Sequence, residues 1–280
     1  MLSGAFLLSN QNNIDYKSFY KKTYKKIIKP ALIFYALYFI TSLALDVREI
    51  AVNGASYSLL LSTLMQLIIG TPAPHLWTTT VLIGIYLLTP FILKFKDILG
   101  DNKFLKFTLI YFIWACFSGN TSYNTIYWSI GTIFCYLGYF LIGYQIRIHS
   151  KKDTKKALLS FIFALVFLLL ALRLQYSHTL MGLAEYMEDY QIIDSFNPLI
   201  VLASLSIFYG FSCISINLNV YKISKYTFYI YLIHAGIVKV VSLIIDKMIT
   251  LQVLIYIPIV SFITLVISLV ISVVLNKVLS

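Results

Sequence analysis

Charged residues and cysteines are both scarce in this sequence. Only 12% of its 280 residues are charged, whereas ordinary soluble domains carry about 25%. Three cysteines over this length cannot provide the dense disulfide framework of a small secreted module. Because 60% of the residues are apolar, the composition excludes a soluble globular enzyme and a disordered chain, and it predicts a polytopic membrane protein.

Several familiar catalytic motifs are also missing. The sequence contains no Gly-rich phosphate loop, no Ser-centred nucleophile elbow and no HExxH zinc motif. Cys116, Cys135 and Cys213 are distant from one another and from the histidines. We interpret them as packing residues rather than as a disulfide or metal site, and we expect no metal and no cofactor.

What the sequence does contain is a series of long apolar runs. A helix needs about 20 apolar residues to cross the hydrocarbon core, and these runs are continuous, whereas the strands of a membrane barrel alternate. We predict an all-α, polytopic transmembrane helix bundle that forms a single domain over residues 1–280. The eight predicted full spans are 30–46, 76–94, 104–118, 127–147, 156–173, 197–217, 225–245 and 251–277.

Basic residues are concentrated in alternate connections between these spans. The connections 10–29, 94–106, 145–156 and 217–225, with the C-terminal end, hold 18 of the 22 Lys and Arg but only 4 of the 11 Asp and Glu. The other connections hold 3 basic and 7 acidic residues. By the positive-inside rule the first set is cytoplasmic, so we expect a multi-pass cell-membrane protein with a cytoplasmic C-terminus. The net charge of +11 is then a topology signal, and we expect no nucleic-acid partner.

A short apolar segment precedes the first predicted span. Residues 1–9 cannot cross a membrane, and they lack the basic flank and the length of a signal peptide. In the same topology this segment runs toward the cytoplasm. We interpret it as the tail of a helix whose beginning is missing, and we expect ten spans in a complete relative.

Histidines at membrane depth are the first candidates for chemistry, because polar groups there are costly. His75 comes just before a span and falls on one helical face with Thr79, Tyr86 and Thr89. That stripe either faces the interior of the bundle or belongs to an interfacial histidine beside Trp77.

The second candidate, His234, lies near the middle of its predicted span. Thr227 and Tyr231 share its helical face at spacings of i, i+4 and i+7. His234 either lines a binding cavity or forms a hydrogen bond that orients a neighbouring helix.

A basic stretch laced with aromatic residues covers residues 16–30 on the predicted cytoplasmic side. It either attracts anionic lipid headgroups or binds a polyanion such as the phosphates of coenzyme A. The lysines concerned are Lys21, Lys22, Lys25 and Lys26.

Two predicted outer loops have unusual compositions. The loop 50–73 is apolar in its second half, so we expect it to dip back into the membrane or to cover a cavity. The loop 178–197 is acidic and aromatic, which suits either a sugar-like acceptor or a solvated cap.

Five segments carry a family resemblance. In order they are MLSGAFLL at 1–8, the lysine stretch at 21–30, HLW at 75–77 with GIYLLTP at 84–90, GYFLIGY at 138–144 and KYTFYIYLIH at 225–234. Together they resemble the acyltransferase-3 family of membrane acyltransferases, which includes surface-polysaccharide O-acetyltransferases. The family pieces read FFMLSGFLL, a basic entry to the third helix, HLWFLY…GLYLLTP, GYFLLGY and T-F-x-IYLIH-P.

The resemblance implies a membrane O-acyltransferase. Such an enzyme would transfer an acyl group, expected to be acetyl, from cytoplasmic acyl-CoA to a hydroxyl of an extracytoplasmic glycan or lipid-linked sugar, with membrane lipid around it. The four lysines would bind the donor phosphates. The predicted cavity lining is His75, Trp77, Tyr86, Tyr231 and His234.

The sequence also departs from the family pattern. The family's first helix carries an Arg and a His proposed as the catalytic base, and that helix is absent here. We therefore expect the catalytic His upstream of Met1, with His75 and His234 as alternatives, and little activity from residues 1–280 alone. Lysines replace the usual arginines, and Ala235 replaces a proline. The alternative functions are a polysaccharide or lipid-linked-sugar exporter without acyl chemistry, or a non-functional gene fragment.

Overall fold

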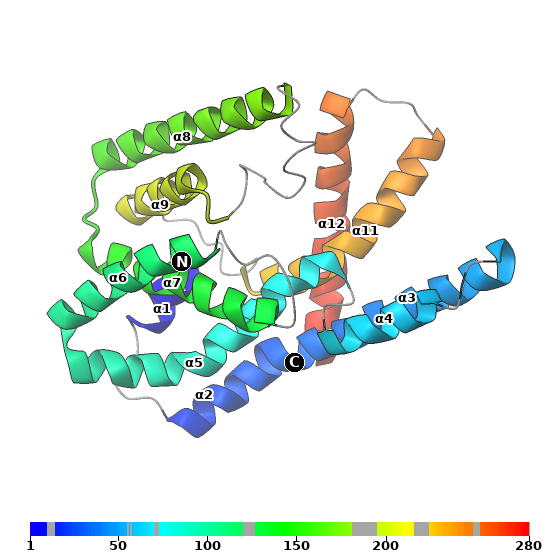
Figure 1. The fold of residues 1–280 in the computed structure, drawn as a ribbon, viewed down its shortest axis with the longest axis horizontal. Helices are drawn as coiled ribbons and strands as arrows, with labels where there is room; N and C mark the ends of the chain where they lie inside the picture. Colours follow the sequence, from blue (N-terminus) through cyan, green and yellow to red (C-terminus); the bar gives the residue numbers. More distant parts are fainter. Residues whose placement is uncertain are drawn as a thin grey trace. The chain divides into compact units, whose positions relative to one another are not determined.

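The chain folds into helices (Figure 1). The contacts between residues divide the chain into two compact units. The computed structural model describes residues 1–9, 15–54, 56, 58–69, 73–119, 127–180, 195–215, 224–248 and 253–279. Unit 1 comprises Met1–Ile14 and Gly84–Asn217, and unit 2 comprises Asp15–Ile83 and Leu218–Ser280. The division falls within helix α5 (Trp77–Leu99), which begins in unit 2 and ends in unit 1.

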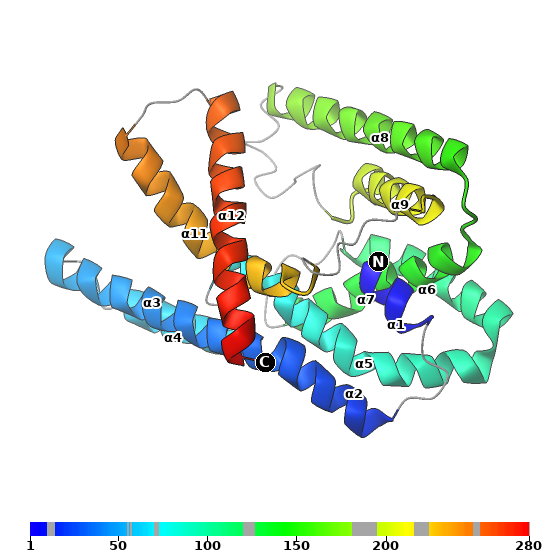
Figure 2. The same cartoon turned by 180° about the vertical axis from the view of Figure 1, so that it is seen from behind.

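Unit 1 is built from packed helix pairs. Helix α6 (Asp101–Gly119) packs against α7 (Tyr127–His149), and α8 (Thr154–Leu180) packs along α9 (Pro198–Cys213). The short helix α1 (Leu2–Leu7) lies against α7. Figures 1 and 2 both show α8 and α9 side by side.

Glycines allow α1 and α7 to approach each other closely. A Cβ atom on Gly4 would collide with the backbone oxygen of Phe140, and a Cβ atom on Gly143 would collide with the backbone of Met1. The two helix backbones are therefore in direct contact, as is common where small residues line a helix interface in a membrane.

The core of unit 1 lies where α6, α7 and the start of α9 meet. Phe112, Cys135, Tyr139 and Phe196 are buried together there. The Tyr139 hydroxyl donates a hydrogen bond of 2.5 Å to the backbone oxygen of Ser195. This bond attaches α7 to the segment that leads into α9.

Unit 2 begins with a long continuous helical segment. Asp15 caps its start by accepting hydrogen bonds from the backbone N–H groups of Lys17 and Ser18, each at 3.2 Å. The segment ends at Gly54, whose φ of +67° suits glycine. Its parts are α2 (Tyr16–Thr23), the π-helical turn η1 (Tyr24–Ile28) and α3 (Lys29–Asn53).

Helix α4 (Ser58–Ile69) packs along α3 within unit 2. The Thr63 hydroxyl donates a 2.5 Å hydrogen bond to the Asp46 carboxylate, which joins the two helices. Both views show them running alongside each other. This apolar helix occupies the second half of the 50–73 segment. Whether it dips into the membrane or covers a cavity stays a prediction.

The remaining helices of unit 2 are α11 (Thr227–Met248) and α12 (Val253–Leu279), which pack against each other. Helix α11 also contacts α3. The short 3-10 turn η2 (Pro74–Leu76) leads into α5. These contacts bring three separate sequence regions together in one unit.

The predicted all-α, multi-pass membrane architecture is confirmed. Each of the eight predicted spans coincides with a helix, and residues 1–9 form the short α1. The number of crossings, the single domain and the cytoplasmic C-terminus stay predictions. Within the described residues, the helical segments long and apolar enough to cross a membrane are Tyr16–Asn53, Trp77–Leu99, Thr154–Ser177, Thr227–Lys247 and Ile255–Lys277.

Candidate functional site

Two histidines and two tyrosines meet in unit 2, and we call His75, Tyr38, Tyr231 and His234 the histidine cluster. The ring of His75 lies 5.0 Å from that of Tyr38, 5.4 Å from that of His234 and 6.2 Å from that of Tyr231, centroid to centroid. The rings of Tyr231 and His234 are 5.6 Å apart. The structure thus brings together three residues of the predicted cavity lining.

The local sequence explains why His75 can reach this position. Ala73 is extended, with φ −147° and ψ 137°, as expected for a residue before proline. Pro74 then starts the 3-10 turn, where its missing N–H removes no helical hydrogen bond. His75 follows, and Trp77, which is half-buried, is the first residue of α5.

Tyrosine hydroxyls fasten this turn to the neighbouring helices. The Tyr231 hydroxyl contacts the backbone oxygen of His75 and the hydroxyl of Thr78. From α3, the Tyr35 hydroxyl donates a hydrogen bond of 3.1 Å to the backbone oxygen of Leu76. Side chains of α3 and α11 therefore both hold the backbone of the turn that carries His75.

The hydrogen bonds of the two imidazoles determine which ring nitrogen carries the proton. Nδ1 of His234 lies 2.6 Å from the backbone oxygen of Tyr231. The His75 ring forms a hydrogen bond with the backbone of Leu232, and its buried Nε2 has no partner among the described residues. Because a carbonyl oxygen only accepts, Nδ1 of His234 donates in its bond, and Nε2 of His75 remains available to a ligand.

An unpaired ring nitrogen in this position is energetically costly. A buried polar atom without a hydrogen bond costs roughly 1–3 kcal/mol, and such atoms are uncommon in native structures. Nε2 of His75 can accept a proton or a hydrogen bond from a ligand. The arrangement leaves Nε2 of His75 open to a ligand, and whether the histidine is functional or interfacial stays a prediction.

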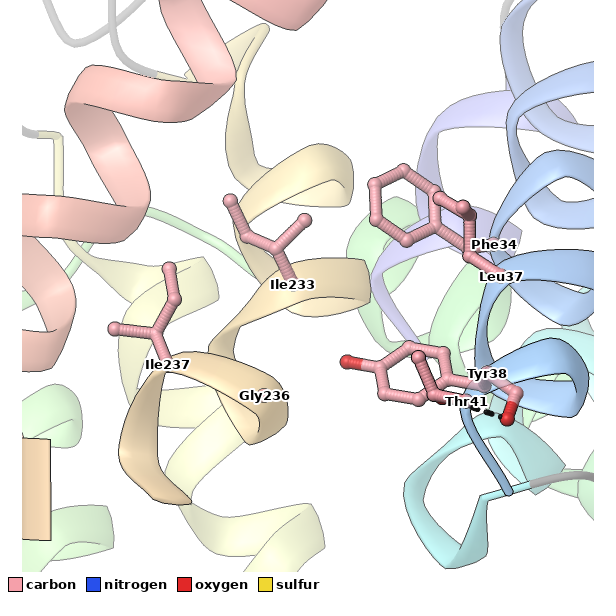
Figure 3. A pocket seen from close by; sticks show the side chains of 7 residues that line it. All are labelled: Phe34, Leu37, Tyr38, Thr41, Ile233, Gly236 and Ile237. Atoms are coloured by element: carbon pink, nitrogen blue, oxygen red, sulfur yellow. Dashed lines mark hydrogen bonds between the residues drawn. The ribbon is translucent and has the colours of Figure 1, made fainter. Parts of the chain in front are cut away.

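An apolar hollow of about 190 Å³ lies beside the cluster, between α3 and α11 (Figure 3). Its wall includes Phe34 and Tyr38 from α3, and Ile233 and Gly236 from α11. Tyr38 belongs to both sites: its ring packs on His75, while its hydroxyl donates a 3.0 Å hydrogen bond to the backbone oxygen of Leu232. A Cβ atom on Gly236 would lie 3.4 Å from the Tyr38 hydroxyl, so the two helices are close at this position.

The four predicted donor-binding lysines lie on the exposed face of α2 and η1. The opposite face carries the buried residues Phe19, Thr23 and Ile27, spaced four residues apart. This pattern is that of an amphipathic segment whose charges face solvent. The exposed lysines are Lys21, Lys22, Lys25 and Lys26.

The lysines and the histidine cluster belong to the same unit and are joined by one helical segment. Tyr38 lies thirteen positions after Lys25 along this segment, which corresponds to about 20 Å at a rise of about 1.5 Å per residue. A ligand with an anionic end and a distant reactive group would suit such an arrangement.

Other predicted residues lie elsewhere. Thr79 and Thr89 are fully buried. The Thr89 hydroxyl donates to the backbone oxygen of Ile85 at 2.8 Å, whereas the Thr79 hydroxyl has no partner in the described part of the chain. Tyr86 belongs to unit 1, where its side chain forms a hydrogen bond with Ser3, so its place in the cavity stays a prediction.

Three further residues of the site were missed by the sequence analysis. Tyr35 and Tyr38 are spaced i, i+3 on α3, which places both on one face, and Thr78 adjoins the predicted stripe. Tyrosines at that spacing within an apolar span were the signal that could have found them. The predicted acceptor loop 178–197 falls mostly outside the described residues. In the described part, no group of His, Cys, Asp and Glu side chains could hold a metal ion.

Comparison with known proteins identifies a family. The family model described as the acyltransferase domain, Acyl_transf_3, matches residues 1–273. No curated protein and no solved structure matches the chain. The matched range covers nearly the whole sequence and includes both the lysine face and the histidine cluster.

Proposed function

The chain belongs to the acyltransferase-3 family of membrane acyltransferases, and on that premise we propose that it transfers an acyl group from cytoplasmic acyl-CoA to a hydroxyl of an extracytoplasmic glycan. Acetyl is the expected acyl group. The histidine cluster is the observation that carries this proposal. Nε2 of His75 is buried and has no partner among the described residues, and Tyr38, whose ring packs on His75, also lines an apolar hollow.

The lysine face supports the donor half of the reaction. Coenzyme A carries phosphates at one end and its thioester at the other, joined by a flexible arm. The phosphates would bind at the four lysines, which offer point charges rather than the bidentate fork of arginine. The thioester would then lie farther along the same helical segment, near Tyr38.

The imidazoles support the chemical half. The acceptor hydroxyl attacks the thioester carbonyl carbon, and Nε2 of His75 takes the hydroxyl proton as general base. The new C–O bond forms, the C–S bond breaks, and the leaving thiolate of coenzyme A receives the proton from the imidazolium. Histidine suits this exchange because its ordinary pKa lies near neutrality.

An acyl-transfer assay tests the proposal directly. Membranes that carry the complete gene product are supplied with radiolabelled acetyl-CoA and surface glycan. We expect acetyl ester on the glycan and release of coenzyme A only when acceptor is present. Translocation of glycan without any ester would instead favour an exporter, and release of coenzyme A that ignores the acceptor would count against glycan as substrate.

Two histidine variants test the assignment of the base. Loss of a general base typically lowers the rate by about 10²–10⁴-fold, so His75→Gln is expected to lower kcat by this amount with little change in the KM for acyl-CoA. His149→Gln is the matched control, because His149 lies at the end of α7 in unit 1. If His75→Gln works at the wild-type rate, His75 is not the general base. The acyl-transfer proposal itself is then decided by the acetyl-transfer assay with the unmutated protein.

A further inference from the structure

A second cavity lies entirely within unit 1. Its residues are different from those of the lysine face and of the histidine cluster, which belong to unit 2. The cavity has a volume of about 320 Å³ and is formed where α1, the end of α7 and the end of α9 come together. Its wall combines two cations, Arg147 and Lys152, with the apolar side chains of Phe6, Phe208 and Phe211. We call it the Arg147–Lys152 cavity.

Within the described ranges, neither Arg147 nor Lys152 forms an ion pair with a carboxylate. The guanidinium of Arg147 lies 4.3 Å from the centre of the Phe6 ring, which orients it without cancelling its charge. Nζ of Lys152 donates to the backbone oxygens of Ser212 at 3.1 Å and Ile214 at 2.7 Å. Both groups therefore present positive charge to the cavity.

The acidic residue nearest in sequence, Asp153, already has other partners. Its carboxylate accepts hydrogen bonds from the backbone N–H groups of Lys155 at 3.0 Å and Lys156 at 3.2 Å. It also forms an ion pair with Nζ of Lys156 at 3.9 Å, which is the only ion pair among the described residues. The cavity thus retains an excess of positive charge that suits an anion.

The apolar part of the wall indicates an amphiphilic ligand. Leu2 is 65% exposed, Phe6 46% and Phe211 59%. In a chain that crosses the membrane, exposed apolar side chains of this kind suit contact with lipid hydrocarbon. A ligand with a phosphate and a hydrocarbon chain would satisfy both the cations and these aromatic walls.

The predicted topology places this cavity where anionic lipids are found. The connection 145–156 is on the predicted cytoplasmic face, and anionic headgroups give that leaflet its negative surface potential. Basic pockets between transmembrane helices on this side are known to bind such headgroups. Arginine in particular binds phosphate with two parallel hydrogen bonds.

We propose that the Arg147–Lys152 cavity binds the phosphate headgroup of an anionic membrane phospholipid, with an acyl chain against Phe6 and Phe211. The bound lipid would join α1 to the ends of α7 and α9. The proposal does not depend on the acyl-transfer function, since no residue of the cavity belongs to the lysine face or the histidine cluster.

Lipid retention measured by native mass spectrometry tests the site. The intact protein is purified from nanodiscs that contain equal amounts of phosphatidylglycerol and phosphatidylcholine. We expect selective retention of phosphatidylglycerol, and a loss of about tenfold or more in Arg147→Gln, because a hydrogen bond to a charged group contributes about 1.5–3 kcal/mol. Arg173→Gln, which removes an arginine from α8 outside the cavity, should retain the lipid like the wild type.

Inorganic phosphate separates a lipid site from a simple anion site. If millimolar phosphate alone displaces the lipid, or if both phospholipids are retained equally, the proposal is wrong. Equal lipid loss in Arg147→Gln and Arg173→Gln would also overturn it, since the effect would then not be specific to the cavity.

A fluorescence measurement keeps the test valid if Arg147→Gln folds poorly. Phe211→Trp places an indole in the cavity wall of an otherwise wild-type chain. Tail-brominated phosphatidylglycerol should quench the added fluorescence several-fold more strongly than brominated phosphatidylcholine. Equal quenching by the two lipids would contradict a specific headgroup site.

Discussion

At the residue scale, Tyr231 connects the two histidines of the candidate site. Its hydroxyl contacts the backbone oxygen of His75 and the hydroxyl of Thr78, while its own backbone oxygen accepts from Nδ1 of His234. One residue therefore fixes the turn that carries His75 and the proton position of His234. This explains how two histidines from distant parts of the sequence can be aligned.

Replacement of this tyrosine by phenylalanine tests the arrangement. Tyr231→Phe keeps the ring and the backbone bond to His234 but removes the hydroxyl contacts. We expect a loss of stability of about 1 kcal/mol, seen as a lower midpoint of thermal unfolding in detergent, and a lower kcat. Tyr176→Phe on α8, where the tyrosine is 67% exposed, is the control and should change neither. Unchanged unfolding in Tyr231→Phe would show that these contacts contribute little.

At the scale of the element, the amphipathic segment α2–η1 carries its charged side chains and its buried side chains on opposite faces. Its lysines face solvent while Phe19, Thr23 and Ile27 are buried. Substitutions of the lysines should therefore leave the fold intact. The effect of these lysines on donor binding can therefore be measured without a change in the fold.

The lysine face can be tested by charge removal. We expect the quadruple change Lys21→Gln, Lys22→Gln, Lys25→Gln and Lys26→Gln to raise the KM for acyl-CoA by at least about tenfold, since each charge-assisted contact contributes about 1.5–3 kcal/mol. The kcat at saturating donor should change little. Lys103→Gln with Lys106→Gln, on the exposed side of α6, is the control. Equal KM values in the two variants would argue for general attraction to lipid instead.

Two glycines of α7 test how closely α1 packs against this helix. Alanine is favoured over glycine inside a helix by up to about 1 kcal/mol, so Gly131→Ala, where nothing lies within 4 Å of the new Cβ atom, should stabilise the protein slightly. Gly143→Ala should instead destabilise it by about 1–3 kcal/mol, because its Cβ atom would collide with the backbone of Met1. Denaturation of the two variants in the same detergent measures the difference. If both variants were more stable than the wild type, α1 would move aside without cost when Gly143 gains a Cβ atom.

At the scale of the whole molecule, the distribution of charge predicts the orientation in the membrane. With 18 of 22 basic residues on one set of connections, the predicted cytoplasmic face includes the C-terminus. Green fluorescent protein fused after Ser280 should therefore fluoresce, and alkaline phosphatase fused after Gln175, at the far end of α8, should be active. Alkaline phosphatase fused after Ser150 should be inactive. The reverse pattern would invert the topology and place the Arg147–Lys152 cavity on the outer face.

Much of the fold could be predicted from the sequence, but less of the site. The apolar runs indicated each of the five described helices that are long and apolar enough to cross a membrane, because a span is a local property of about 20 consecutive residues. Only the family resemblance placed His75 and His234 in one cavity, since 159 positions separate them and no local pattern encodes a contact between helices. Tyr38 was missed for the same reason: its role depends on α3 lying against α11.

The sequence by itself determined that this protein is a helical membrane protein of the acyltransferase-3 family and how its charges alternate along the chain. These properties depend on composition, on the length of apolar runs and on short motifs, all of which are local. Only the tertiary structure decided that Tyr38 packs with His75 and His234 in one cluster, and that Arg147 and Lys152 share a cavity with Phe6. Such groupings depend on which helices pack together, and packing joins residues that the chain keeps far apart.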